Sequence, residues 1–180
     1  MPKSIPVLFI ALCSFVQVAH ADSRALNGYG KTTWGMTPDK VLAAESPRAK
    51  TMAKPTSFRG GSAGLVSIPY LKVSSVSFSA VFVFDAKKKL KRVVLTSAQQ
   101  KHHSVNVVDF TSLQQLLIEK YGPPTYKTDL PPEAEGNHDV SWKLPKTMIK
   151  LSLLYIPRDV TTVTISYRPT VLADEETKDL

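Results

Sequence analysis

Apolar and polar residues alternate most clearly in the central and C-terminal parts of the chain. Residues 76–84, "VSFSAVFVF", and residues 163–167, "VTISY", place apolar side chains at every second position. Alternation of this kind is typical of strands that bury one face of a sheet. Val81 and Val83 add apolar side chains to the opposite face, so we expect part of that face to be covered as well.

Two segments carry the signals of helices. Thr37 suits an N-cap, and the proline after it suits the first helical position, so we expect a helix over residues 38–45. A second helix is expected to begin at Asp109 or Thr111, because leucines then recur along one stripe. Gly122 stands where a left-handed C-cap belongs, and the two prolines that follow it end this helix.

The polar segments between these elements predict loops. Residues 48–64 are rich in Lys, Ser, Gly and Pro, and residues 125–139 are polar and contain two prolines. Outside these loops we expect three strands in each half of the chain. They begin at residue 65 and continue at 76–84 and 90–97 in the first half, and lie at 140–143, 148–155 and 160–168 in the second.

The order of these elements indicates an α+β fold with a repeated pattern. Each half reads as one helix followed by three antiparallel strands, which predicts two pseudo-repeats at about residues 34–100 and 108–168. Each helix has one apolar stripe to bury, so we expect both helices on one face of the sheet. These units make a single domain over residues 22–170, followed by an acidic, flexible tail at residues 171–180.

The first 21 residues have the features of a cleaved signal peptide. Lys3 precedes an apolar stretch at residues 5–18, and residues 19–21, "AHA", have the A-x-A form of a cleavage site. We therefore expect a periplasmic or secreted protein that is soluble after cleavage. The single cysteine, Cys13, lies inside this segment, so the mature chain is expected to have no disulfide and no thiolate metal site.

Three short motifs resemble those of small exported bacterial proteins of unknown function. "WGMTPDKV" resembles their W-G-M-[ST]-x-x-x-V opening, "FVFDAKKKLKRVVL" their F-x-F-x-x-x-x-L-x-x-V hairpin, and "LIEKYGPPT" their L-x-x-x-Y-G-x-P motif. The helix and three-strand unit is similar to that of SmpA/OmlA-type outer-membrane lipoproteins and of tandem-repeat beta-lactamase inhibitor proteins. Those families bind other proteins, so the resemblance implies an envelope protein as partner and no catalytic residues to carry over.

Residues 25–32, "ALNGYGKT", fit the loosest spacing of a phosphate-binding loop, with Gly30, Lys31 and Thr32 at its characteristic positions. Such a loop also needs a strand before it and a helix directly after it, so that backbone N–H groups converge on the phosphates. Only residues 22–24 precede the motif in the expected mature chain, and the predicted helix begins no earlier than residue 38. We therefore reject nucleotide binding at this motif.

Other side chains that support catalysis or metal binding are scattered. His102 and His103 are adjacent, and on a strand they would point to opposite faces, while His138 lies in a distant predicted loop. The chain contains no H-E-x-x-H metal motif. Residues 60–64, "GGSAG", match the letters of a G-x-S-x-G motif, but they lie in a predicted loop that leads into a strand and not into the helix that a nucleophile elbow requires. We expect no metal site, no cofactor and no catalytic residue, and a hydrolase with an unrecognised site is the alternative.

The densest functional candidate is a basic stretch at one end of a predicted hairpin. Its cations are Lys87, Lys88, Lys89, Lys91 and Arg92, in a chain of formal net charge +8. Their positive potential favours anionic lipid or glycan, although lysines at a hairpin also discourage edge-to-edge sheet pairing. Nucleic acid is not expected, because aromatic residues are not interleaved with these cations. Our leading interpretation is a non-enzymatic binding or scaffold module that contacts another envelope protein.

Overall fold

The structure, a computed structural model, describes residues 26–58, 60–97, 102–158 and 160–171. The predicted signal peptide with Cys13, and the acidic tail beyond Val171, lie outside the described residues. In chain order the elements are β1 (Gly28–Tyr29), β2 (Thr32–Thr33), α1 (Pro38–Ala44), β3 (Lys50–Phe58), β4 (Ser62–Val73), β5 (Val76–Phe84), β6 (Leu90–Ser97), α2 (His103–Tyr121), β7 (Tyr126–Lys127), β8 (Gly136–Lys143), β9 (Thr147–Ile156) and β10 (Val160–Pro169).

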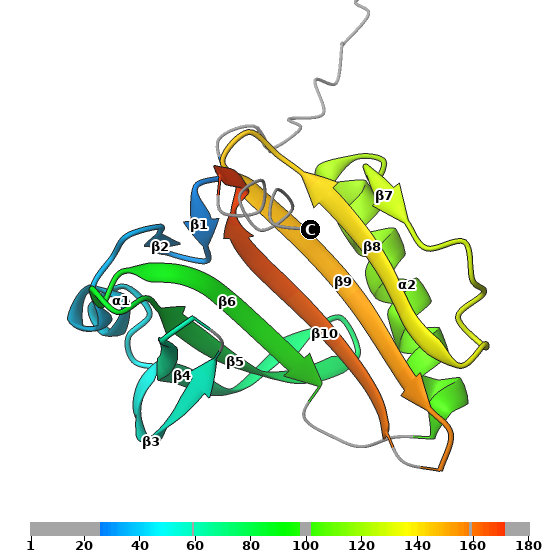
Figure 1. Cartoon of the computed structure of the whole chain (residues 1–180), viewed down its shortest axis with the longest axis horizontal. Coiled ribbons are helices and arrows are strands. Elements are labelled where there is room, and N and C mark those ends of the chain that lie inside the picture. Colours follow the sequence, from blue (N-terminus) through cyan, green and yellow to red (C-terminus); the bar gives the residue numbers. More distant parts are fainter. Residues whose placement is uncertain (1–25, 59, 98–101, 159, 172–180) are drawn as a thin grey trace, which may run out of the picture.

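Eight of these strands form one antiparallel sheet in the order β3-β4-β5-β6-β10-β9-β8-β7 (Figure 1). β1 and β2 form a separate two-stranded hairpin. β6 and β10 pair at the centre of the large sheet, with Tyr167 opposite Val93, so the two halves of the chain share one continuous sheet. The fold is therefore α+β with an antiparallel sheet, as the alternation of apolar residues predicts.

One row of side chains across the sheet marks the core face. Opposite residues in a sheet share a face. On six neighbouring strands this row consists of Val66, Phe82, Val93, Tyr167, Ile149 and Trp142, all buried.

The helices contribute side chains to the same core. α2 packs Phe110, Leu113 and Leu117 into it beside β9 and β10, and α1 contributes Val41.

The opposite face of the sheet is partly covered, as Val81 and Val83 predict. Val83 is only 1% exposed. Gly64 has no side chain on this face, and its neighbours occupy the free space: a Cβ added to Gly64 would lie 2.5 Å from Val81 Cγ1 and 3.5 Å from Phe58 Cε2. Phe58, at the end of edge strand β3, therefore packs against β4 at Gly64.

The predicted loop at residues 48–64 is wrong, because β3 and the start of β4 occupy most of it. β3 is an edge strand, and nearly all of its side chains are exposed, so it lacks the apolar alternation that identifies a half-buried strand. Four strands therefore follow α1, and a two-residue strand, β7, precedes the three long strands after α2. The expected count of three strands in each half does not describe the whole sheet.

The second helix begins at His103, six residues before Asp109, so the predicted start at Asp109 or Thr111 is wrong. Asp109 is a buried residue inside the helix, together with Asn106, whose side chain donates hydrogen bonds to Thr161. A polar residue that a helix buries therefore gives the same signal in the sequence as a residue that caps a helix. His102 is the N-cap residue of α2 and His103 is its first residue, so the two adjacent histidines lie at the start of a helix.

His138 was expected in an exposed loop, and it is instead buried at 2% exposure in β8. Its register partner is Leu153 on β9, so the imidazole belongs to the core face of the sheet. Nε2 lies 2.7 Å from the backbone oxygen of Ala134, which precedes β8. The contact therefore links the segment before β8 to the sheet. β8 begins at Gly136, so the predicted loop at residues 125–139 is wrong for its last four residues.

Candidate functional site

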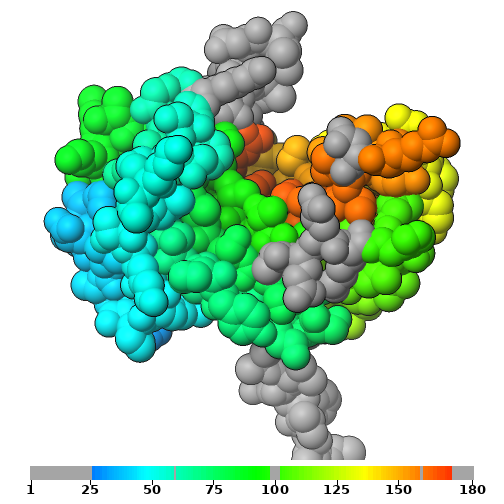
Figure 2. Space-filling model, turned by 90° about the horizontal axis from the view of Figure 1, so that it is seen from below, coloured from blue at the N-terminus to red at the C-terminus, as the bar shows by residue number. Residues whose placement is uncertain are grey.

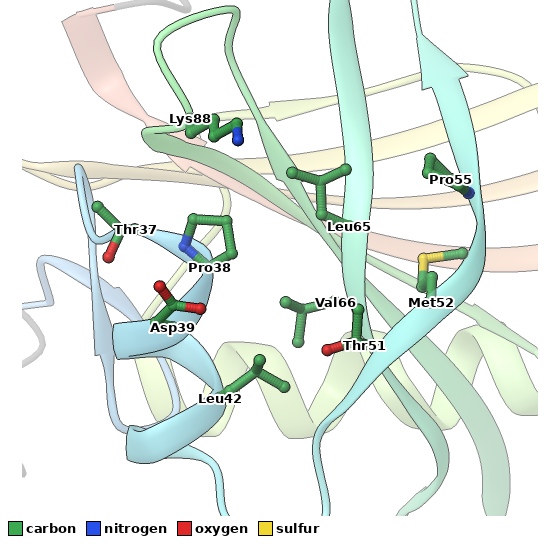
Figure 3. A pocket seen from close by; sticks show the side chains of 10 residues that line it. All are labelled: Thr37, Pro38, Asp39, Leu42, Thr51, Met52, Pro55, Leu65, Val66 and Lys88. Atoms are coloured by element: carbon green, nitrogen blue, oxygen red, sulfur yellow. The ribbon is translucent and has the colours of Figure 1, made fainter.

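A groove of about 410 Å³ lies between α1 and β3, above the start of β4 (Figure 3). Leu65 and Val66 of β4 lie between its two walls, and Lys88 comes from the turn that joins β5 to β6. This groove is an open concave site formed by described residues. Its lining consists of Thr37, Pro38, Asp39, Leu42, Thr51, Met52, Pro55, Leu65, Val66 and Lys88.

The groove exists because β3 leaves its partner strand and returns to it. Thr51 is paired with Val66, and pairing resumes at Thr56 opposite Gly64, so a step of five residues on β3 matches a step of two on β4. The extra residues form an arch that includes Pro55, whose nitrogen carries no hydrogen for a ladder bond. Proline is tolerated there because β3 is at the edge of the sheet. The arch holds the outer wall of the groove away from β4.

The opposite wall of the groove is the first turn of α1. The expected helix over residues 38–45 is confirmed, since α1 begins at Pro38 with Thr37 as its N-cap residue. The Thr37 side chain makes no capping hydrogen bond with the helix, and it lines the groove instead. Leu42 lies one turn further along the same wall, so the groove surface is mainly apolar with hydroxyl groups at its margin.

The β5–β6 turn presents Lys88 to the groove. Lys88 has a positive φ of 56°, and its backbone N–H donates to the Asp85 carbonyl oxygen at 2.9 Å. The Asp85 carboxylate accepts the backbone N–H of Lys89 at 2.8 Å, so it fixes the turn from within. The turn thereby places the backbone of one lysine at the rim of a mainly apolar groove.

The structure separates the five cations of the predicted basic stretch. Lys87, Lys88 and Lys89 are exposed in the turn, whereas Lys91 and Arg92 are half-buried in β6. Among them Lys88 lines the groove. The sequence thus indicated one rim of the groove and missed its walls, for which the proline within residues 50–58 was the available signal of an edge strand.

Charge is concentrated in the half of the chain that forms the groove. Residues 26–97 contain twelve lysines and arginines against three aspartates and glutamates, whereas residues 102–171 contain seven of each. The segments that follow α1 and the segments that follow α2 lie on opposite sides of the molecule (Figure 2). The segment that forms the groove therefore carries an excess of nine positive charges, which favours anionic partners.

The rejected phosphate-loop motif forms the β1–β2 hairpin, with Gly30 and Lys31 as its two-residue turn. Gly30 has a φ of +58°, which favours glycine. The backbone N–H of Lys31 donates to Glu45 Oε1 at 2.8 Å, and Arg48 Nε donates to Glu45 Oε2 at 2.9 Å. Thr32 donates its hydroxyl to the Tyr29 carbonyl. The anion that this turn binds is thus a buried carboxylate of the same chain.

Two tyrosines pack together beneath this hairpin. The rings of Tyr29 and Tyr167 lie 5.0 Å apart between centroids. Burial raises the pKa of Tyr29, an effect that the positive charge of Arg48 opposes. Burial also raises the pKa of Tyr167 well above 10.0, and Tyr121 adds to the shift. Both phenols belong to the core beneath the hairpin, and neither lines the groove.

The histidines do not converge. His103 stacks on Tyr155 with 3.5 Å between ring centroids, and its Nδ1 lies 3.3 Å from Thr161 Oγ1 at the far end of β10. His138 lies on β8, where its register neighbours are residues of β9. Within the described ranges, no group of three or more His, Cys, Asp or Glu side chains is placed to hold a metal ion.

The fold and this groove define an α+β protein with an apolar, basic-rimmed site at one edge of its sheet. No protein-family model matches the chain, and no curated protein matches it. A DUF4309 family protein (YjgB) from Bacillus subtilis subsp. subtilis str. 168 is similar over 80% of this chain and 85% of its own, with 10% identity and a TM-score of 0.44. No function is transferred from so distant a likeness. Over the described ranges, neither helix is long and apolar enough to cross a membrane.

Proposed function

We propose that the chain is an exported, non-enzymatic binding module that contacts another envelope protein through the groove between α1 and β3. The observation that carries this proposal is the groove itself, about 410 Å³ in volume and lined largely by apolar side chains. Concave apolar sites of this size accept a few anchoring side chains or a small ligand. Export rests on the signal-peptide features of residues 1–21.

The polar groups of the groove favour binding over catalysis. Thr37 and Thr51 supply hydroxyl groups, and Asp39 and Lys88 supply the charges. A hydroxyl nucleophile needs a base within hydrogen-bond distance and a group that orients that base. Neither threonine has a histidine beside it in the lining of the groove. The arrangement is suited to hold a partner in place.

We further infer that the domain is built from two related units, each with one helix and three main strands. The strands of these units are β4–β6 and β8–β10, and β3 and β7 are then additional strands at the two edges of the sheet. Each unit runs from near one edge towards the centre, where β6 meets β10. In this description β3, which forms one wall of the groove, is an addition to the first unit, and the proposed binding site therefore lies outside the part that the two units share.

The proposal is tested by comparing variants of two exposed threonines on β3. Thr51 lines the groove and Thr56 does not, so Thr51→Trp fills the groove and Thr56→Trp is its matched control. Each variant and the parent are used as bait for envelope extracts, and bound proteins are quantified by mass spectrometry. We expect a protein retained by the parent and by Thr56→Trp to be lost with Thr51→Trp. Equal retention by all three baits would exclude the groove as the binding site.

A second candidate function is binding of anionic lipid or glycan. It is favoured by the exposed lysines of the β5–β6 turn, Lys87, Lys88 and Lys89. Surface binding of this kind depends on the summed charge, so each lysine is expected to contribute to a similar extent. Co-sedimentation with phosphatidylglycerol vesicles tests it. If Lys87→Glu, Lys88→Glu and Lys89→Glu weaken vesicle binding equally, the result supports binding by a general basic surface. If only Lys88→Glu weakens it, the result supports binding at the groove.

A further inference from the structure

We propose that the segment bound by the groove is acidic, and that it inserts one large apolar side chain between α1 and β3 while a carboxylate meets Lys88. This inference rests on the proposed function and names the chemistry of the partner. It is drawn from three features: the apolar lining, the position of Lys88, and the net positive charge of residues 26–97.

The apolar lining defines the anchor. Leu42, Met52 and Leu65 come from three different elements and all face the same space (Figure 3). A volume of about 410 Å³ holds one or two large side chains and is too small for a folded element. Binding energy at protein interfaces is concentrated in such buried anchors, so one large residue is expected to dominate.

The charge around the groove selects acidic residues beside that anchor. This half of the chain has three acids, and two of them are already engaged within the fold. Glu45 is buried and pairs with Arg48, and Asp85 accepts the backbone N–H of Lys89. Asp39, on the first turn of α1, is the acid that lines the groove. Twelve lysines and arginines exceed these three acids in residues 26–97, and this net positive charge attracts an acidic segment and disfavours a basic one.

The position of Lys88 distinguishes this site from a general basic surface. Lys87 and Lys88 are adjacent and both exposed, but only Lys88 belongs to the lining of the groove. Their substitution by glutamate changes the net charge by the same amount. A difference between the two variants therefore reports contact within the groove, because long-range attraction affects both almost equally.

The experiment is selection of a random peptide library, displayed on phage, against the purified protein. The selected peptides are expected to contain Asp or Glu beside one Phe, Trp, Leu or Ile. A synthetic copy of the most frequent peptide is then measured by fluorescence anisotropy. We expect Lys88→Glu to weaken its binding by about tenfold or more and Lys87→Glu by less than about threefold. Thr51→Trp is expected to abolish binding, and added salt to weaken it.

The possible failures are distinguishable. Neutral or basic peptides that still require an open groove would overturn the acidic chemistry and leave the groove as a protein-binding site. Peptides that bind Thr51→Trp as well as the parent would overturn the proposed function itself. Failure to select any peptide, combined with binding to phosphatidylglycerol vesicles that Lys87→Glu and Lys88→Glu weaken equally, would refute a protein partner in favour of a lipid surface.

Discussion

Glu45→Ala is expected to lower stability more than any other removal of a charged side chain in the first half of the chain. The Glu45 residue is 1% exposed, and its carboxylate joins the β1–β2 turn to the end of α1. It accepts the backbone N–H of Lys31 and two N–H groups of Arg48. Truncation leaves the amide and the guanidinium without this acceptor, and the hairpin loses its link to the helix.

The magnitude follows from these three hydrogen bonds. The amide of Lys31 bonds a buried carboxylate at 2.8 Å, a charge-assisted bond worth about 1.5–2 kcal/mol. The Arg48 side chain is 48% exposed, so solvent screens the ion pair, and its contribution is about 0.5–1 kcal/mol. Glu45→Ala is therefore expected to lower the free energy of unfolding by about 2–3 kcal/mol. Glu45→Gln keeps an oxygen acceptor for Lys31 and is expected to lose about half as much.

Urea denaturation at pH 7, followed by tryptophan fluorescence, measures both losses. Glu119→Ala is the matched control, because Glu119 is an exposed glutamate on α2 that accepts a hydrogen bond from Gln115 at 3.1 Å. Its expected cost is below about 0.5 kcal/mol. If Glu45→Ala were no more destabilising than Glu119→Ala, the account of the hairpin as a turn held by a buried carboxylate would be wrong.

Three further predictions concern the core and the hairpin. Gly30→Ala is expected to lower the free energy of unfolding by about 1–3 kcal/mol, because Gly30 has a φ of +58° and an added Cβ would contact Glu45 Oε1. An unchanged midpoint of urea denaturation would disprove this close approach. Tyr167→Phe should reduce the loss of stability above pH 10, because the buried phenol stays protonated while the unfolded chain ionises; denaturation series at pH 9 and 11 check this. Trp142→Ala is expected to cost about 3–5 kcal/mol, since it opens the core and removes the 2.8 Å bond from Trp142 Nε1 to the Gly122 carbonyl; a calorimetric change below 1 kcal/mol would contradict that packing.

The parts of the fold that bury apolar side chains could be predicted from the sequence. β5 and β10 alternate as expected, and α1 begins at Pro38 after its N-cap residue. β3 gave no such signal, because an exposed edge strand buries too little to impose a period. The sequence predicts the start of α2 too late, because Asn106 and Asp109 are polar residues that the helix buries. The partner of Asn106 is Thr161 on β10, 55 residues along the chain, and sequence periodicity does not show such a contact.

The groove could be predicted only in part. Lys88 was found through the density of cations in its turn, which is a local feature of the sequence. The walls depend on a register shift between Thr51 and Thr56 on β3, and register is a property of two strands together. His138 illustrates the same limit: a polar context indicated a loop, and pairing with β9 buried it.

The central claim is that a protein partner occupies the groove between α1 and β3. The most direct test places a small photo-cross-linking amino acid, a diazirine analogue no larger than leucine, at Thr51 or at Thr56 in living cells. Both side chains are exposed on β3, and Thr51 alone of the two lines the groove. The small side chain leaves the groove open, unlike the tryptophan of Thr51→Trp. The account predicts one discrete protein adduct from position 51 that is absent from position 56. The same adducts from both positions, or no adduct from position 51, would contradict it.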